Sequence, residues 1–164
     1  MPSLPSALEI TQDIVRMDTR NPPGREIECA TYLGNLLSDA GIEVEAHEFA
    51  KDRTSLVARL KGSGEKPPIC FAGHIDVVPL GAKPWSVDPF GAEIIDGKLY
   101  GRGTTDMKAG IAAFVHTALK LAGEDRTGQA DMVMAICAGE ETGCEGSFHL
   151  SDIGALGEAG SVVI

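Results

Sequence analysis

The chain has 164 residues, of which 43% are hydrophobic, 23% charged and 5% aromatic. This composition is typical of a soluble globular protein, and the length predicts one domain with a sizeable core. The formal net charge of −10 argues against nucleic acid and against an anionic membrane as the partner, because both are recognised by basic surfaces.

Two helices are predicted at the start of the chain. The first covers residues 6–17, and the proline pair of the sequence NPPG separates it from the second. Their buried faces are expected to consist of residues at helical spacing: Leu8, Thr11 and Val15 in the first helix, and Ile27, Ala30, Leu33, Leu37 and Ala40 in the second, which Gly41 closes.

Strands are predicted over most of the next sixty residues. Apolar and polar residues alternate over 41–49, which favours a half-buried strand, and residues 54–62 predict another. The apolar run PPICFAGHIDVVP (67–79) fits a central strand that is buried on both faces. Residues 85–103 predict strands that are broken by a hairpin turn at Asp96-Gly97.

The last third of the chain predicts a helix over 106–121, a buried strand over 130–137, a loop or short helix over 152–160 and a final strand in GSVVI. This alternation predicts an α/β fold: a three-layer α/β/α domain with a largely parallel mixed sheet and an antiparallel hairpin at one side. GSVVI stops where a strand would reach the ligand-binding edge of such a sheet. We therefore expect residues 1–164 to be the N-terminal part of a longer protein.

The sequence also predicts the cellular compartment. Its first residues, MPSLPSALEI, lack the basic start and the apolar stretch of a signal peptide, and no run has membrane-spanning length. The four cysteines form no C-x-x-C pair, and Cys70 and Cys137 lie in apolar runs that predict small core residues. We expect a reducing cytoplasmic location.

Polar side chains follow the two buried strands at the points where the apolar runs end. His74 and Asp76 come after the first run, Glu140 and Glu141 after the second, and Asp106 follows the glycine-rich turn YGRGTTD. Ligands of open α/β sheets bind beyond the carboxyl ends of the strands. We therefore expect these three segments to meet at one edge and to form a metal site of carboxylate oxygens and imidazole.

The spacing of His74 and Asp76 has a physical interpretation of its own. Residues at i and i+2 of an extended chain share a face. His74 can then bind a metal through one ring nitrogen while Asp76 accepts a hydrogen bond from the other, which fixes the tautomer of the ring.

Each of these residues also has a plainer interpretation. His74 fits a core histidine with satisfied hydrogen bonds, Asp106 fits a helix N-cap, and Glu140 with Glu141 fits a solvated pair in a loop. Other polar residues are expected to be structural or exposed: His47, His116 and His149, the loop thiol of Cys144, Arg102 as a support of its loop, and Lys108 pointing to solvent.

Three motifs in fixed order carry a resemblance to a known family. GHIDVVP, YGRGTTDMKAG and AGEETG resemble the dinuclear zinc amidohydrolases and metallopeptidases, which include acetylornithine deacetylase, succinyl-diaminopimelate desuccinylase, carboxypeptidase G and the aminoacylases. The resemblance extends over essentially the whole chain and includes WSVDPF before the hairpin.

The resemblance implies a role for each site residue. His74 would bind one metal, Asp106 would bridge both metals, and Glu141 would bind the second. Asp76 would orient His74. Glu140 would act as the general base on a water molecule between the metals. The resemblance also implies a cis peptide bond between Asp106 and Met107.

The implied reaction is hydrolysis of the amide bond of an N-acyl amino acid or a small peptide. The cofactors would be two divalent metal ions, with zinc the first expectation and cobalt or manganese compatible with the same ligands. In the family, a further acidic ligand, a C-terminal histidine and a lid or dimerisation domain complete the protein, and none of these lies within residues 1–164. The full-length protein would then be a candidate homodimer.

Two hypotheses for function remain after the sequence analysis. The first is a metal-dependent amidohydrolase. The second is a catalytically silent fragment or relative that keeps the fold as a binding or structural module. The first is favoured because His74, Asp106 and Glu141 match metal ligands that the resemblance implies. For residues 1–164 taken alone the second is favoured, because the other implied ligands are not among them.

Overall fold

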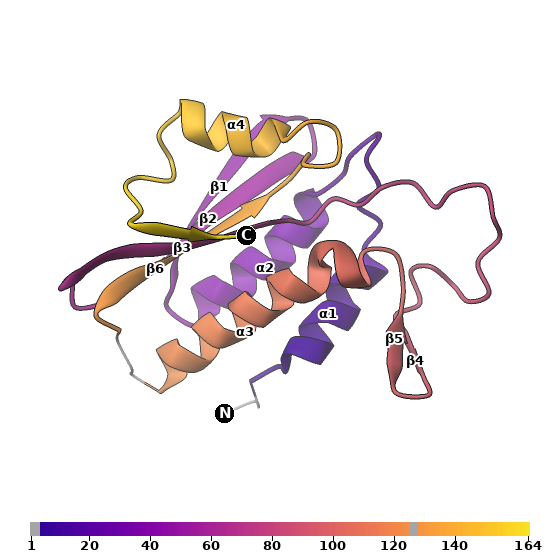
Figure 1. Cartoon of the computed structure of the whole chain (residues 1–164), viewed down its shortest axis with the longest axis horizontal. Coiled ribbons are helices and arrows are strands. Elements are labelled where there is room, and N and C mark those ends of the chain that lie inside the picture. The colour runs from indigo at the N-terminus through magenta and orange to yellow at the C-terminus, as the bar shows by residue number, and fades with distance from the viewer. Residues whose placement is uncertain (1–3, 125–127) are drawn as a thin grey trace.

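The computed structural model of the chain describes residues 4–124 and 128–164 (Figure 1). The helices are α1 (Ala7–Arg16), α2 (Ile27–Asp39), α3 (Ala109–Gly123) and α4 (Glu145–Asp152), and a π-helical turn, η1 (Thr104–Lys108), precedes α3. The strands are β1 (Glu43–Ala50), β2 (Arg53–Leu60), β3 (Lys66–His74), β4 (Glu93–Ile95), β5 (Lys98–Tyr100), β6 (Ala130–Cys137) and β7 (Ser161–Val163).

Five of these strands form the central sheet, in the order β1-β2-β6-β3-β7. β1 pairs with β2 and β2 with β6 in antiparallel fashion, whereas β6 with β3 and β3 with β7 are parallel. Only β2 therefore runs against the other four strands, which confirms the predicted α/β fold with a largely parallel mixed sheet.

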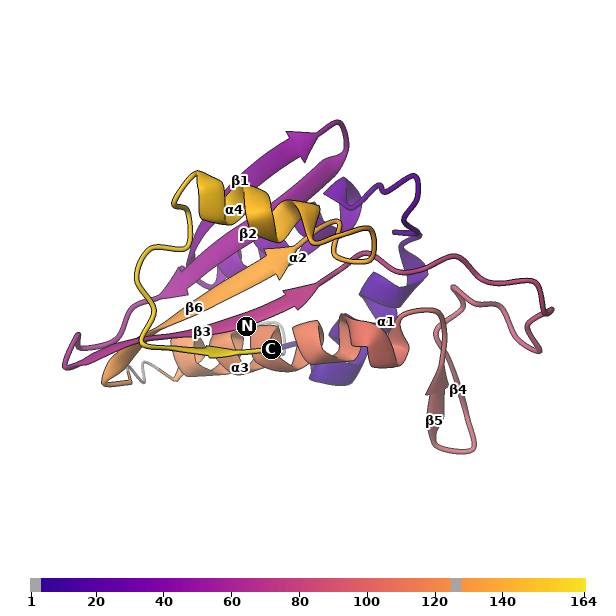
Figure 2. The ribbon, with the colours of Figure 1, turned by 45° about the horizontal axis from the view of Figure 1, so that its top comes forward.

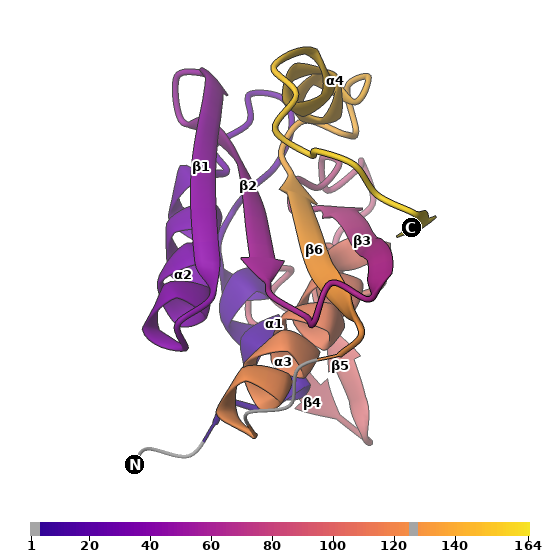
Figure 3. The same cartoon turned by 90° about the vertical axis from the view of Figure 1, so that its left-hand side faces the viewer.

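Helices cover both faces of this sheet and make three layers. α1, α2 and α3 lie on one face and α4 lies on the other, as Figures 1 and 3 show from two sides. Each face has its own apolar core. The larger core includes Ile14, Leu33 and Ile111, and the smaller includes Val57, Val133 and Leu150 beneath α4. Figure 2 shows α4 lying across the strands.

The first two helices were located correctly, but their buried faces differ from the prediction. In α1 the buried residues are Ile10, Thr11, Ile14 and Val15, whereas Leu8 is exposed. In α2 the prediction holds for Ala30, Leu33 and Leu37 and is wrong for the two end residues Ile27 and Ala40, which are exposed.

The hairpin predicted around Asp96-Gly97 is confirmed, with both residues at positive φ as a tight two-residue turn requires. It forms a separate two-stranded sheet beside the main one. The expected helix at 106–121 begins later, at Ala109, because Asp106 and Met107 have non-helical backbone angles within η1. Asp106 therefore caps no α-helix.

The helix α4, whose residues are EGSFHLSD, was not predicted from the sequence. Only Gly146 and Leu150 of this helix are buried, so it shows almost no apolar periodicity. Residues 152–160 contain its last residue and a turn rather than a helix of their own.

Within residues 4–124 and 128–164, no helix combines the length and the apolar character needed to cross a lipid bilayer.

Gly146 sets the distance between α4 and the sheet. A Cβ atom at this position would lie 2.2 Å from the carbonyl oxygen of Ala138 and 2.6 Å from Ser55 Oγ. We expect Gly146→Ala to lower the free energy of unfolding by about 1–3 kcal/mol, because the backbone must move. Gly123→Ala is the control: a Cβ there meets nothing within 4 Å, so stability should stay equal or rise by up to about 1 kcal/mol. Urea unfolding measures both, and equal stability of the two variants would contradict the prediction.

Candidate metal centre

The sheet brings two of the predicted segments to the same edge. β3 and β6 are parallel neighbours in which His74 lies opposite Cys137, the last residues of the two strands. The pairing continues one step further, where the N–H of Ile75 donates to the carbonyl oxygen of Cys137 at 2.9 Å. The residues after each strand therefore leave the sheet side by side.

The imidazole of His74 lies at the centre of the cluster. Its Nε2 atom is 3.2 Å from Asp106 Oδ1 and 3.7 Å from Glu140 Oε2. One potential ligand atom from each of His74, Glu140 and Glu141 lies within 4.8 Å of the others. The structure thus brings His74, Glu140 and Glu141 together, and Asp106 contacts this group through Nε2 of His74.

Asp76 lies beneath this cluster and connects its parts. Its side chain is fully buried. Oδ1 accepts a hydrogen bond from the main-chain N–H of Glu140 at 3.0 Å, and Oδ2 accepts one from the N–H of Glu141 at 3.1 Å. Although burial acts to raise it, the hydrogen bonds from His74, Asn21 and these two N–H groups hold the pKa of Asp76 below its usual value.

The orientation of His74 depends on Asp76 in a way that differs from the sequence prediction. The nearest acceptor to Nδ1 is the main-chain carbonyl oxygen of Asp76, at 3.0 Å, and the carboxylate is farther away at 3.5 Å. A carbonyl only accepts, so Nδ1 carries a proton and Nε2 is the nitrogen that faces the acids. The carboxylate is turned toward the main chain of Glu140 and Glu141, which explains its greater distance.

The pKa of His74 reflects this environment. Burial acts to lower it, but the hydrogen bonds with Asp76 and the negative charges of Asp76 and Glu140 raise the pKa to about 9. At neutral pH and without metal, the ring is therefore protonated and its Nε2–H donates to Asp106. A metal ion that binds here displaces that proton.

The cluster holds more negative charge than the protein neutralises. Within residues 4–124 and 128–164, no lysine or arginine forms an ion pair with Asp106, Glu140 or Glu141, and His74 is the only positive group in reach. Burial and the charges of Asp106 and Glu140 raise the pKa of Glu141, against the effect of His74. Two carboxylates ~4 Å apart repel by about 1–4 kcal/mol, depending on exposure. Carboxylate oxygens and an imidazole nitrogen that lie together, with no lysine or arginine paired to the acids among the described residues, fit a divalent cation such as zinc.

Asp106 is placed by η1, and Lys108 anchors that turn. The prediction that Lys108 points to solvent is wrong: its side chain is fully buried, and Nζ donates to the carbonyl oxygens of Ile14 at 2.7 Å and Met17 at 2.9 Å. These carbonyls lie at the end of α1, where a cation interacts favourably with the helix dipole. Burial lowers the pKa of Lys108. The Asp106–Met107 peptide bond is cis, as the resemblance implies.

The remaining polar residues of the sequence analysis lie in structural positions. Arg102 supports its loop, as expected, by donating to the Pro79 carbonyl oxygen and stacking on Trp85. His116 bonds the Pro5 carbonyl oxygen and His149 packs against Phe49. The thiol of Cys144 lies 3.8 Å from Glu140 Oε1.

A group of polar residues around Asp76 was not predicted from the sequence. Asn21 is buried and donates to both Asp76 and Thr142. Thr142 in turn bonds Glu145, which Arg53 also contacts. NPPG predicted only a loop, and no local pattern reveals that its asparagine reaches residues more than fifty positions away.

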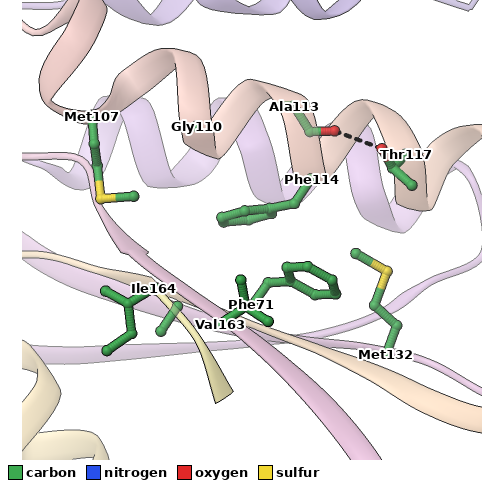
Figure 4. A pocket seen from close by; sticks show the side chains of 10 residues that line it. Phe71, Met107, Gly110, Ala113, Phe114, Thr117, Met132, Val163 and Ile164 are labelled. Atoms are coloured by element: carbon green, nitrogen blue, oxygen red, sulfur yellow. Dashed lines mark hydrogen bonds between the residues drawn. The ribbon is translucent and has the colours of Figure 1, made fainter. Parts of the chain in front are cut away.

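An apolar pocket of about 380 Å³ lies between α3 and the sheet. Figure 4 shows Phe71, Met107, Phe114 and Ile164 around it. None of the predicted site residues and no charged side chain lines this pocket. It therefore offers no group for acid–base or metal chemistry.

The buried carboxylate of Asp76 leads to a prediction about stability. In Asp76→Asn, one oxygen becomes an NH₂ group that faces a main-chain N–H, so a buried donor loses its acceptor. We expect the free energy of unfolding to fall by about 2–4 kcal/mol. Asp39→Asn is the matched control, because Asp39 is exposed, and it should change stability by less than about 0.5 kcal/mol. Urea unfolding that gives the same result for both variants would refute this assignment.

Solved structures resemble the whole chain. An M20 family metallo-carboxypeptidase from Sulfolobus solfataricus superposes with a TM-score of 0.81 at 21% identity, over 97% of this chain and 37% of that one. Human carnosine dipeptidase 1 superposes with a TM-score of 0.77 at 22% identity, over 90% and 35% of the two chains. At these identities the likeness establishes the fold.

Comparison of the amino-acid sequence with curated proteins finds relatives of higher identity. A protein of Staphylococcus aureus named probable succinyl-diaminopimelate desuccinylase is 35% identical over 158 residues, 96% of this chain and 38% of the relative. A succinyl-diaminopimelate desuccinylase of Parvibaculum lavamentivorans is 40% identical over 141 residues, 83% and 34% of the two chains. The chain thus spans little more than a third of these relatives. The model of peptidase family M20/M25/M40 matches residues 70–163, more than half of the chain. The chain belongs to this family, as the three motifs indicated.

Proposed function

We propose that the protein containing this chain is a metal-dependent amide hydrolase whose substrate is an N-acyl amino acid or a small peptide. The observation that carries the proposal is the cluster of His74, Glu140 and Glu141, with Asp106 3.2 Å from His74 Nε2. Within residues 4–124 and 128–164, no lysine or arginine forms an ion pair with these acids. Family membership and relatives named as desuccinylases support the same reaction class.

Three side chains would hold the metal ions. His74 offers Nε2, because Nδ1 is engaged with the carbonyl oxygen of Asp76. Asp106 has a largely exposed carboxylate next to that nitrogen, so both its oxygens are open to bind, and we assign it the bridging position. Glu141 is the third ligand. When bound, two divalent ions would polarise the substrate carbonyl and lower the pKa of a water molecule between them.

Glu140 is our candidate for the general base. Its main-chain N–H is fixed by Asp76, and its carboxylate reaches into the cluster while its side chain remains 42% exposed. An exposed carboxylate without a lysine or arginine partner can accept a proton from the attacking water and deliver it to the leaving amine. Glu141, by contrast, is the acid whose pKa burial raises, and binding a cation would relieve that cost.

The substrate class follows from the relatives rather than from the cluster. A desuccinylase removes a dicarboxylic acyl group from an amine, so we propose an acyl amino acid with a free carboxylate as the first substrate to test. Because residues 1–164 span 34–38% of those relatives, we assign residues 1–164 to the N-terminal part of a catalytic domain and place the acyl specificity outside them.

The assigned roles of the two glutamates predict different defects in the full-length protein. Glu140→Gln removes the proton acceptor, so kcat should fall by about 10²–10⁴-fold with metal content unchanged. Glu141→Gln should lower the metal content itself. Glu28→Gln is the control, because Glu28 is exposed on α2, and should match the unchanged protein. Amidase assays on N-succinyl and N-acetyl amino acids measure kcat, and elemental analysis measures the metal content. Full activity of Glu140→Gln would overturn its role.

Residues 1–164 alone would contribute two of the three protein ligands of each metal, His74 with Asp106 and Asp106 with Glu141. We therefore expect the isolated chain to bind zinc weakly and to have little or no amidase activity, because a missing ligand weakens binding. Zinc titration calorimetry on the isolated chain tests this. Two tight sites would contradict the expectation and would mean that residues 1–164 form a complete metal centre.

A further inference from the structure

We propose that Asn21 is a positioning residue, which fixes the Glu140–Glu141 main chain through the carboxylate of Asp76 and the hydroxyl of Thr142. The inference rests on the proposed function for its consequence in catalysis, but its geometry stands on the metal-free protein. Asn21 is 3% exposed and comes from the loop after α1, far along the chain from both partners.

The backbone of Asn21 is anchored beside the segment that follows β3. Its N–H donates to the carbonyl oxygen of Val77 at 2.8 Å, and the N–H of Val77 donates to the carbonyl oxygen of Thr19 at 3.1 Å. Residues 19–21 therefore pair with residues 75–77 like a short added strand, and Asn21 lies next to Asp76 in a fixed position.

The side-chain amide of Asn21 makes both of its N–H bonds within the site. Nδ2 donates to Asp76 Oδ2 at 2.8 Å and to Thr142 Oγ1 at 2.8 Å. An ionised carboxylate only accepts hydrogen bonds, so the NH₂ end of the amide must face Asp76. Asparagine is the side chain that reaches both acceptors with two donors and brings no charge. Aspartate in its place would set a second negative charge against Asp76.

The same hydrogen bonds extend to the far side of the turn. Thr142 Oγ1 accepts from Asn21 and donates its own proton to Glu145 Oε2 at 3.1 Å. Glu145 Oε2 also accepts from Arg53 Nη1 at 3.2 Å, and Arg53 is held by the buried carboxylate of Glu26. The turn is thus fixed at Glu140 and Glu141 by Asp76 and at Thr142 by Asn21.

These hydrogen bonds determine where the side chains of Glu140 and Glu141 lie. The Asp76 carboxylate receives the N–H groups of Glu140 and Glu141, so the direction of that carboxylate sets where both acidic side chains begin. Without the Asn21 amide, Oδ2 of Asp76 keeps only the hydrogen bond from the N–H of Glu141. Thr142 loses its hydrogen bond to the loop after α1. The turn can then shift, and residues that support metal ligands typically contribute 10–100-fold to metal affinity or activity.

Thr19 provides a matched control for a merely structural role. Its hydroxyl is buried and donates to the carbonyl oxygen of Ile75, whereas the pairing of residues 19–21 with residues 75–77 uses main-chain hydrogen bonds, which valine at position 19 keeps. Thr19→Val should therefore destabilise the protein and leave the turn and the metal affinity unchanged.

The experiment compares Asn21→Leu and Thr19→Val in the full-length protein. Hydrogen exchange by mass spectrometry on the metal-free protein should show protection of the peptide spanning 139–143 falling at least tenfold in Asn21→Leu and unchanged in Thr19→Val. Titration with Co²⁺, followed by its visible absorption, should show affinity reduced by ~10–100-fold in Asn21→Leu only. If Asn21→Leu alters melting temperature alone, as Thr19→Val does, the proposal is overturned.

A second pair of variants covers the case in which Asn21→Leu fails to fold. Thr142 is exposed, so Thr142→Val removes the hydroxyl with little risk to folding, and Thr142→Ser restores it. We expect Thr142→Val to loosen residues 139–143 and Thr142→Ser to behave as the unchanged protein. Equal exchange in both variants would contradict the proposed link. The exchange results hold whether or not the protein hydrolyses amides, so they separate this proposal from the proposed function.

Discussion

The buried carboxylate of Asp76 is the interaction on which the rest of the site depends. It lies below the carboxyl ends of β3 and β6 and accepts hydrogen bonds from Asn21 and from the main chain of Glu140 and Glu141. A charge removed from water is costly unless it is fully hydrogen-bonded. The same bonds that satisfy Asp76 therefore hold three segments of the chain in one place. Asp76 thus positions the main chain from which the side chains of Glu140 and Glu141 extend.

This arrangement explains how adjacent acids can end a core strand. The main chain of Glu140 and Glu141 is held by hydrogen bonds to Asp76, so the two side chains lie next to His74 despite their mutual repulsion. In the metal-free chain the positive charge of His74 offsets part of that repulsion. Such a site favours a divalent cation over the proton that it replaces, because one ion can contact several of the carboxylates at once.

The sequence predicted the parts of the site that follow from strand ends and short motifs. His74, Glu140 and Glu141 were found because apolar runs mark where β3 and β6 stop, and Asp106 because of the motif around it. Asn21 was missed because its role depends on the pairing of residues 19–21 with residues 75–77, which no local pattern encodes. Lys108 was misassigned because lysine is rarely buried, and here two carbonyl oxygens at the end of α1 accept its protons. The helix α4 escaped notice because one of its contacts with the sheet is the backbone of a glycine, Gly146, which adds nothing to an apolar pattern.

Anomalous diffraction at the zinc absorption edge, from crystals of the zinc-loaded full-length protein, would locate the metal ions directly. We expect two peaks, one held by His74 and Asp106 and the other by Asp106 and Glu141. Zinc bound elsewhere, with His74 Nε2 still hydrogen-bonded to Asp106, would contradict this expectation.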